Sequence, residues 1–457
     1  MKSEALFVLA LLCCTAPVMA QNYTDVFPGD GTLSAAIEAA ADGDILLLLP
    51  EAEYTESVLK TMGTIAEKSL AIVVDGDGSA KAKVKILTDP GDGTCQFFHV
   101  GNNGALLLDG IAFDGAVDGV TKVSYLVRCH MGEIAQPAFL KKIHLQNCEV
   151  RNLKGNVLDG AGNSLAGNVV VDTTIVDNCM IHDSATLVHY KYVGCNYIRV
   201  SNSTMVNITS YGIRINGNSD TQRYEYPEVH VDHTTWYNMG LTDPREIILT
   251  EKATVLFDKP IYITNSIFSA QTNWETSTKT ALNIKTTLND NMATIANICM
   301  WQLSAKKNWL KHTIRDTIRM DPGFADPAHG DFTLPAGSLL RSYGSDGGPI
   351  GDLRWATYPS GVAQNGGSLP EAYALAQNYP NPFNPATTLS FALPKAQRVR
   401  LTVYDARGRM IAELADGQFA AGEHRVLFFG ADLPSGVYFY ELCGETFSRT
   451  RKMLLMK

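Results

Sequence analysis

A repeat of about thirty residues runs through the middle of the chain and limits the folds open to it. One polar position recurs in six aligned segments, at intervals of 31, 24, 31, 32 and 32 residues. The six residues are Asn147, Asn178, Asn202, His233, Asn265 and Asn297. An aliphatic residue stands two positions before each of them, and a large apolar residue stands three positions after. This long period, held over six copies, is typical of a solenoid in which each repeat forms one coil.

Each coil must supply short strands whose alternate residues face a common interior. We expect a buried Asn at each turn, bonded to its own turn and to the amide of the next coil. Such a column resembles the asparagine ladders of right-handed parallel β-helix proteins. A β-sandwich would not hold so long a period, and a leucine-rich repeat would be shorter. The predicted fold is therefore all-β, a right-handed parallel β-helix.

Both ends of the repeat region fit this fold. Residues 32–40 form a short amphipathic pattern, and an apolar run, 45–49, follows it. This order resembles the capping helix and first strand of pectate-lyase-like β-helices, in which the helix covers the open end of the core. Residues 321–341 resemble the closing coil of secreted β-helices, and 348–355 resemble the end of uncharacterised β-helix domains. The predicted β-helix domain spans residues 21–358.

The first twenty residues predict export. Lys2 supplies a positive start, an apolar run follows it, and Val18-Met19-Ala20 forms a small-residue cleavage site. The run is too short to span a bilayer, and no other stretch is long and apolar enough. Cys13 and Cys14 leave a lipoprotein signal as the alternative, although Leu12 directly before them fits it poorly. The other seven of the nine cysteines show no metal-binding spacing and read as buried apolar side chains.

A second module follows a linker at residues 359–372 that is rich in Gly, Ser and Pro. Residues 373–457 alternate apolar positions with turn signals and predict a small antiparallel, Ig-like β-sandwich. The motif Asn378-Tyr379-Pro380-Asn381-Pro382-Phe383-Asn384-Pro385 and the basic C-terminus resemble the type A C-terminal sorting domain of the type IX secretion system. That resemblance implies passage across an outer membrane with the type IX machinery as partner, followed by release or surface attachment. An ordinary carbohydrate-binding sandwich is the alternative.

A second aligned set of strands predicts where chemistry sits, because the packed interior leaves only the outer faces for binding. Its outward column contains His99, Arg128, His189, Arg214, Thr250 and Asn283. The next outward column contains Gly101, His130, Lys191, Asn216, Lys252 and Lys285. This register turns Leu249 and Glu251 inward, and it leaves the coil near residues 156–160 without an assigned place. The columns form a basic stripe with about 4.8 Å between coils, which suits an acidic polysaccharide.

The stripe suggests β-elimination on a uronate polymer, which needs a cation beside the carboxylate and a base near the reacting carbon. Arg128 or Arg214 would neutralise the carboxylate. Lys191, crowded by other cations, would be the base, with His189 as its rival. The remaining cationic and imidazole side chains would contact substrate: His99, His130, Lys252 and Lys285. The resemblance to pectate-lyase-like proteins is one of fold, and the local catalytic motif of the chondroitinase B and alginate lyase family is absent.

Two other functions remain open: a non-catalytic glycan-binding or adhesive surface protein, and a structural β-helix whose stripe is simply solvated. Outward aromatic residues such as Tyr237 and Trp301 would favour glycan binding. A net charge of −9 gives no positive field for nucleic acid. No Asp-Asp pair or Gly-x-Ser-x-Gly motif supports hydrolytic chemistry. No cofactor is expected, although Asp75-Gly76-Asp77 could bind calcium as well as form a turn.

Overall fold

The structure is a computed structural model of the whole chain, which divides into two units, residues 1–357 and 358–457. Each unit is described by itself. The structure describes the following residues: 22–57, 60–76, 80–88, 94–121, 123–129, 138–160, 169–190, 193–216, 227–239, 247–251, 259–269, 282–284, 293–303, 313–345, 347–355, 372–378, 381, 383, 386–395, 397–419, 422–430, 433–444 and 447–456.

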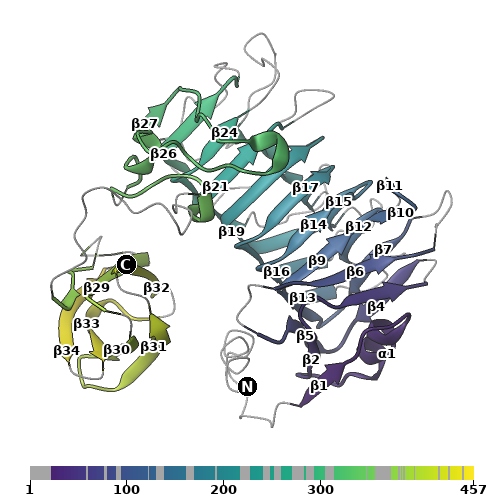
Figure 1. Cartoon of the computed structure of the whole chain (residues 1–457), viewed down its shortest axis with the longest axis horizontal. Coiled ribbons are helices and arrows are strands. Elements are labelled where there is room, and N and C mark those ends of the chain that lie inside the picture. Colours follow the sequence, from purple (N-terminus) through teal and green to yellow (C-terminus); the bar gives the residue numbers. More distant parts are fainter. Residues whose placement is uncertain are drawn as a thin grey trace. The chain divides into compact units, whose positions relative to one another are not determined.

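The first unit is a right-handed parallel β-helix, as the repeat predicts, and each full coil contributes strands to three faces (Figure 1). The first face is an eight-stranded parallel sheet in which consecutive coils are neighbours. Its strands are β4 (Thr61–Ile65), β7 (Gln96–Val100), β12 (Tyr125–Cys129), β15 (Asn156–Asp159), β18 (Thr186–Tyr190), β20 (Ile213–Asn216), β22 (Ile248–Glu251) and β25 (Leu282–Ile284).

The second and third faces belong to one 17-stranded sheet that bends at the Asn turns. The second face contains β1 (Tyr23–Val26), β2 (Ile45–Leu48), β5 (Ser69–Val74), β8 (Ala105–Asp109), β13 (Ala138–Gln146), β16 (Val169–Asp177), β23 (Ile261–Thr264), and the first parts of β19 (Gly194–Ile208), β21 (Glu228–Tyr237), β26 (Ala293–Trp301) and β27 (Thr313–Ile318). The third face contains β3 (Glu53–Glu56), β6 (Ala82–Ile86), β9 (Ile111–Asp114), β14 (Glu149–Arg151), β17 (Met180–Ser184), β24 (Ile267–Ser269) and the remainders of β19, β21, β26 and β27. A two-stranded hairpin, β10 (Ala116–Val117) and β11 (Val120–Thr121), lies outside these faces.

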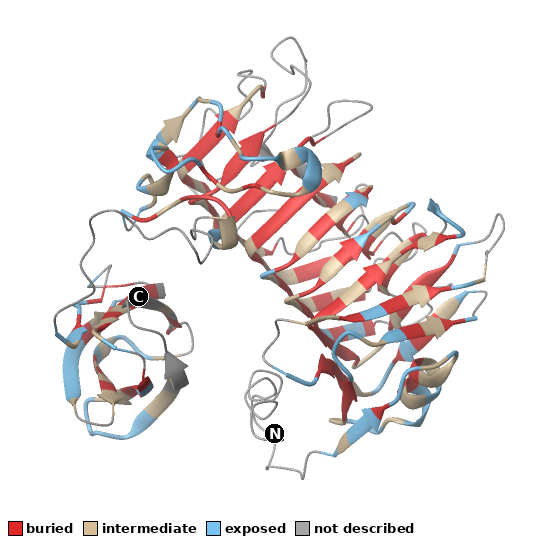
Figure 2. Ribbon diagram, in the orientation of Figure 1, coloured by how far each residue is buried: buried red, intermediate tan, exposed pale blue. Residues whose placement is uncertain are grey.

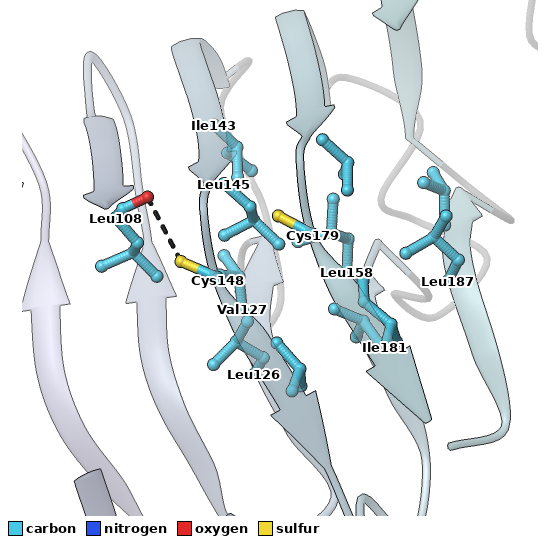
Figure 3. Packing of buried hydrophobic residues seen from close by; sticks show 14 of the residues in the cluster. Leu108, Leu126, Val127, Ile143, Leu145, Cys148, Leu158, Cys179, Ile181 and Leu187 are labelled. Carbon is cyan, nitrogen blue, oxygen red and sulfur yellow. Dashed lines mark hydrogen bonds between the residues drawn. The ribbon is translucent and has the colours of Figure 1, made fainter. Parts of the chain in front are cut away.

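The interior is a continuous apolar core, and Figure 2 shows buried residues along the strands of successive coils. Figure 3 shows Leu145, Leu158 and Ile181 in this core, with Cys148 and Cys179 on neighbouring coils. Cys148 donates through its thiol to the carbonyl of Leu108 at 3.4 Å. The cysteines of the β-helix that the structure describes are all buried, as expected for small apolar side chains.

The Asn column adopts a left-handed backbone, which explains why Asn and His recur there. All six residues have φ between 46° and 54°, a region that Asn enters more easily than most side chains do. Asn178 donates to the side-chain oxygen of Asn147 at 2.6 Å, so part of the expected ladder forms. The expectation that these side chains are buried was wrong for most of them: Asn178 is exposed, and Asn265 is the buried one. The turn conformation, and not burial, selects the residue type.

A second ladder follows five residues after the first. Asn152, Asp183, Asn207 and Asn238 also have positive φ, between 53° and 58°. Asn238 donates to the side-chain oxygen of Asn207 at 2.6 Å, and Asn207 donates to Asp183 at 2.9 Å. These residues form the turn between the third face and the next strand of the eight-stranded sheet.

The helix α1 (Thr32–Ala39) closes one end of the core, as predicted. Its Leu33 and Ile37 are 0% and 1% exposed. At Gly63 on β4, an added Cβ would lie 2.9 Å from the Ile37 side chain, so the helix packs directly on the strand backbone. The helix thereby covers apolar side chains that would otherwise face water at the first coil.

Residues 319–345 and 347–355 cross back over the later strands of the third face, β17 to β26. The segment contains three short 3-10 helices, η3 (Pro327–His329), η4 (Leu339–Arg341) and η5 (Leu353–Trp355). Asp352 accepts a hydrogen bond from Thr204 at 2.6 Å, and its backbone N–H donates to Thr235 at 2.9 Å. Tyr237 does point outward, but it packs against Phe324 and Phe332 of this segment. It is therefore not a platform for a sugar ring.

The second unit contains two antiparallel sheets around its own core, as the sequence predicts for a sandwich. The three-stranded sheet is β28 (Ala374–Leu375), β29 (Ala386–Leu393) and β32 (Gly422–Phe429). The four-stranded sheet is β31 (Met410–Phe419), β30 (Gln397–Asp405), β33 (Gly436–Gly444) and β34 (Ser448–Leu455). In the part of the chain that the structure describes, no helix is long and apolar enough to cross a membrane.

Candidate functional site

One outward column of the eight-stranded sheet brings five polar side chains together, one from each of five consecutive coils. The printed strand register pairs neighbours along the series His99, Arg128, Asp159, His189 and Arg214. Four of these residues are those that the sequence predicts for the column, and Asp159 is the addition. We call these five residues the site column. Because neighbouring strands lie about 4.8 Å apart, an extended polymer along the helix axis would meet one of them per coil.

Asp159 is the member that sequence reasoning missed, and it changes the charge of the column. Its side chain is 1% exposed, and its Oδ2 lies 3.6 Å from Nε of Arg128. Its Oδ1 lies 3.4 Å from Nδ1 of His189 and accepts a hydrogen bond from Asn156 at 2.7 Å. The repeat held a usable signal, because Leu158-Asp159 aligns with Val127-Arg128 and Val188-His189. The stripe therefore carries an acid between its cations, which offsets the expected repulsion between like charges.

The environment of His189 favours one tautomer. The Asn156 amide nitrogen lies 2.9 Å from Nδ1 of His189 while also donating to Asp159. An amide nitrogen is a donor, so Nδ1 accepts and the proton of the neutral ring sits on Nε2. Flipping the Asn156 side-chain amide would place its oxygen next to the Asp159 carboxylate, which is unfavourable. Nε2 is buried and has no hydrogen-bond partner among the described residues, and a buried polar atom of that kind marks a place for a ligand or water.

Each arginine of the site column lies over a tyrosine ring from its own strand or the turn before it. The Arg128 guanidinium carbon is 5.0 Å from the ring centre of Tyr125, and that of Arg214 is 4.5 Å from the ring centre of Tyr211. Both tyrosines stand three residues before their arginine. Burial, aided by the charge of Asp159, raises the pKa of Tyr125 above its usual value, while Arg128 opposes the shift. The rings hold the guanidinium groups in place through cation–π contact.

The predicted register fails at β22, where it is off by one residue. Arg214 pairs with Leu249, and Ile215 pairs with Thr250, so Thr250 does not belong to the site column. Glu251, expected inward, pairs with Asn216. The reason is the apolar run at 247–249, which allows two registers, and the fold uses Ile248, 1% exposed, for the interior position. Asn283 pairs with Leu249 and thus keeps its predicted place in the series.

Four predicted site residues lie outside the described residues: His130, Lys191, Lys252 and Lys285. Their roles rest on sequence alone. Asp77 of the possible calcium motif also lies outside them. Among the residues that the structure describes, no group of three or more His, Cys, Asp or Glu side chains could hold a metal ion.

A histidine–carboxylate cluster on the third face has a structural role. Nδ1 of His182 lies 2.8 Å from Oδ2 of Asp183, and Nε2 of His182 lies 3.6 Å from Oε1 of Glu149. Burial opposes its charge, but the bonds to these two carboxylates outweigh burial and raise the pKa of His182 to about 9. Neighbouring Lys85, Asp114 and Arg151 continue an alternation of charge along this face.

The raised pKa of His182 predicts how stability depends on pH. Since the folded pKa is above the unfolded value of about 6.5, the stabilisation is complete below that value and is lost as the pH rises through about 9. We expect the wild-type chain to lose about 2 kcal/mol from this group between pH 6 and pH 10, and His182→Gln to lack that part of the slope. Urea unfolding at both pH values checks this. Equal slopes in the two proteins would contradict it.

Comparison with known proteins identifies two segments. Residues 229–355 match a family described as a domain of unknown function, DUF5123. Residues 377–456 match the secretion system C-terminal sorting domain. The second unit is therefore a type IX sorting domain, and the protein is exported through the outer membrane to the cell surface or the medium. No curated protein matches the chain.

Among solved structures, a PL6 family alginate lyase, AlyGC, matches with 18% identity and a TM-score of 0.40, over 67% of this chain and 40% of the enzyme. An arginine-to-alanine mutant of the same enzyme matches similarly, over 68% of this chain. A pectate lyase matches with 12% identity and a TM-score of 0.32, over 76% of this chain and 95% of that enzyme. The chain thus spans about two fifths of the length of the alginate lyase.

Proposed function

We propose that this exported β-helix binds an acidic polysaccharide along the site column and cleaves it by β-elimination at a uronate unit. The observation that carries the proposal is the alignment of Arg128, Asp159, His189 and Arg214 on consecutive coils, with the Nε2 of His189 buried and without a protein partner in the described part of the chain. Side chains repeated at the spacing of the coils suit a repeating polymer better than a small ligand.

The chemistry follows from the reaction. A base removes the proton from the carbon next to the carboxylate, a double bond forms, and the bond to the leaving oxygen breaks as that oxygen takes a proton. Arg214 would pair with the uronate carboxylate and stabilise the charge that develops on it. His189, with its proton on Nε2, would donate to the leaving oxygen. Lys191, two positions further along the sequence, would be the base.

The contacts of His189 weigh against its use as the base. A base must present an unprotonated nitrogen, so Nε2 could accept a proton only if Nδ1 already carried one. That arrangement would break the bond from Asn156, whose amide is held by Asp159. We assign the substrate carboxylate to Arg214 because it lies on the coil next to His189, the proposed proton donor. Arg128 and His99 would contact neighbouring units of the polymer, with His130, Lys252 and Lys285 proposed from sequence.

A non-catalytic glycan-binding protein is the second candidate. The tyrosine rings beneath Arg128 and Arg214 favour it, because arginine and aromatic side chains together bind sugars and their acid groups without any reaction. Binding of this kind needs neither Lys191 nor a proton donor, so the two candidates differ in their response to single substitutions.

The test is to incubate the secreted chain with pectate, alginate and chondroitin sulfate and to follow the ultraviolet absorbance of new unsaturated uronate ends. We expect absorbance to rise with one polymer, and Arg214→Ala and Lys191→Ala each to reduce the rate at least about 100-fold. Lys85→Ala, which removes a cation from the third face, is the matched control and should leave the rate unchanged. The lyase proposal is wrong if the absorbance rises with none of the polymers. If the chain is then retained on one immobilised polymer in a salt-sensitive way, it is a non-catalytic glycan-binding protein.

A further inference from the structure

The outward side of the second face carries another aligned series, in which four of the five residues are polar or aromatic. The strand register pairs neighbours along His144, Ile175, Arg199, His230 and Tyr262, on β13, β16, β19, β21 and β23. A parallel series two positions earlier contains Lys142, Thr173, Tyr197 and Glu228. We call His144, Tyr197, Arg199, His230 and Tyr262 the second-face patch. It lies on a different sheet from the site column.

Aromatic rings stack from coil to coil within this patch. The ring centres of Tyr197 and His230 are 5.4 Å apart, and those of His230 and Tyr262 are 4.8 Å apart, with tilts of 37° and 31°. Nε2 of His230 lies 2.6 Å from Oε1 of Glu228. All four of these residues are partly exposed. Glu228 is thus bound to His230, and the three stacked rings form a partly exposed aromatic surface.

Arg199 and His144 have polar atoms that the protein does not satisfy. Nε of Arg199 and Nε2 of His144 are buried and have no hydrogen-bond partner in the described part of the chain. Arg199 forms no ion pair with any described residue, and His144 is 4% exposed. Burial, with the charges of Lys142 and Arg199, lowers the pKa of His144 to about 3, so its ring is neutral. A buried guanidinium nitrogen without an acceptor is costly to the fold.

We propose that the second-face patch is a second glycan-binding surface, which takes an acid group of a polysaccharide on Arg199 and the adjoining sugar rings on Tyr197 and Tyr262. A carboxylate or a sulfate supplies the acceptor atoms that the Arg199 fork lacks. The neutral His144 adds a donor or acceptor without charge. Because the site column lies on another face, a polymer bound at the patch is held in addition to the one at the site column.

The experiment is affinity electrophoresis of the full chain through native gels that contain pectate, chondroitin sulfate or neutral dextran. The two acidic polymers distinguish a carboxylate from a sulfate. Arg214→Ala serves as the background, because it weakens the site column. We expect an acidic polymer still to retard this variant, and Arg199→Gln in the same background to reduce the apparent affinity at least about tenfold. Lys141→Gln, an exposed cation on β13, is the matched control and should change nothing.

Two further variants guard against a folding defect. Arg199→Lys keeps the charge but loses the planar fork and should bind with intermediate affinity. Tyr262→Ala removes an edge ring without touching Arg199 and should weaken retardation several-fold. The proposal is overturned if Arg214→Ala alone abolishes retardation, if Arg199→Gln and Tyr262→Ala both bind like their background, or if no acidic polymer retards the wild-type chain. A different outcome would count against the proposed function instead. If Arg199→Gln abolishes retardation and Arg214→Ala leaves it unchanged, the polymer binds at the second-face patch and not at the site column.

Discussion

Asp159→Ala is expected to lower the free energy of unfolding by about 3 kcal/mol, because it removes a buried carboxylate that forms an ion pair with Arg128. The carboxylate is 1% exposed, and it neutralises Arg128, whose side chain is 22% exposed. It also accepts the Asn156 amide that orients His189. The substitution should therefore also abolish turnover or binding at the site column. Urea unfolding and the uronate absorbance assay measure the two effects separately.

A double-mutant cycle separates the ion pair from simple loss of packing. Arg128→Ala and Asp159→Ala together should destabilise the chain by less than the sum of the single substitutions, since the second removes a charge that the first has already left unpaired. Additive effects would show that Asp159 and Arg128 do not interact in the folded protein. Asp177→Ala on the second face is the matched control, because its carboxylate accepts hydrogen bonds from the Ser201 hydroxyl and the Asn202 amide.

The fold was predictable because its main determinants recur. Asn147, Asn178 and their counterparts mark turns that need positive φ, and the apolar residues around them mark the interior. The period and the apolar positions around it therefore predicted the coil and its inward positions, including Trp236, while its right-handed sense came from the resemblance to known β-helices. The covering segment was not predictable in this way. Asp352 binds Thr204 across 148 residues of sequence, and nothing in a local pattern indicates a contact so distant.

The site column was predictable where each coil has a clear apolar–polar alternation and not where it lacks one. His99, Arg128, His189 and Arg214 follow obvious buried positions, and the strand register aligns them. Thr250 was misplaced because three aliphatic residues in a row at 247–249 leave the register undetermined. Asp159 was missed because the coil near residues 156–160 was left without an assigned place in the register. Its burial depends on partners from two other coils, which a single repeat cannot reveal.

Trp236→Ala is expected to have the largest effect on stability of any substitution in the coils next to Arg214. The indole is fully buried, stacks against Phe268 with ring centres 6.2 Å apart, and donates to the Thr234 hydroxyl at 2.7 Å. Removing a buried tryptophan leaves a cavity and costs about 4 kcal/mol. Trp301→Ala, which changes a half-buried tryptophan on β26, is the matched control and should cost much less.

Trp236→Ala should also weaken the function of the site column, because Trp236 packs against the strand that carries Arg214. A Cβ added to Gly212 would lie 2.6 Å from Cζ3 of the indole, so the ring contacts the backbone two residues before Arg214. In a solenoid each coil is held mainly by its neighbours, and a cavity at this point loosens that strand first. We therefore expect Trp236→Ala to reduce turnover or binding at the site column even where the chain remains folded, and Trp236→Phe to reduce it less. Unchanged activity in folded Trp236→Ala would show that the core beneath β20 does not position Arg214.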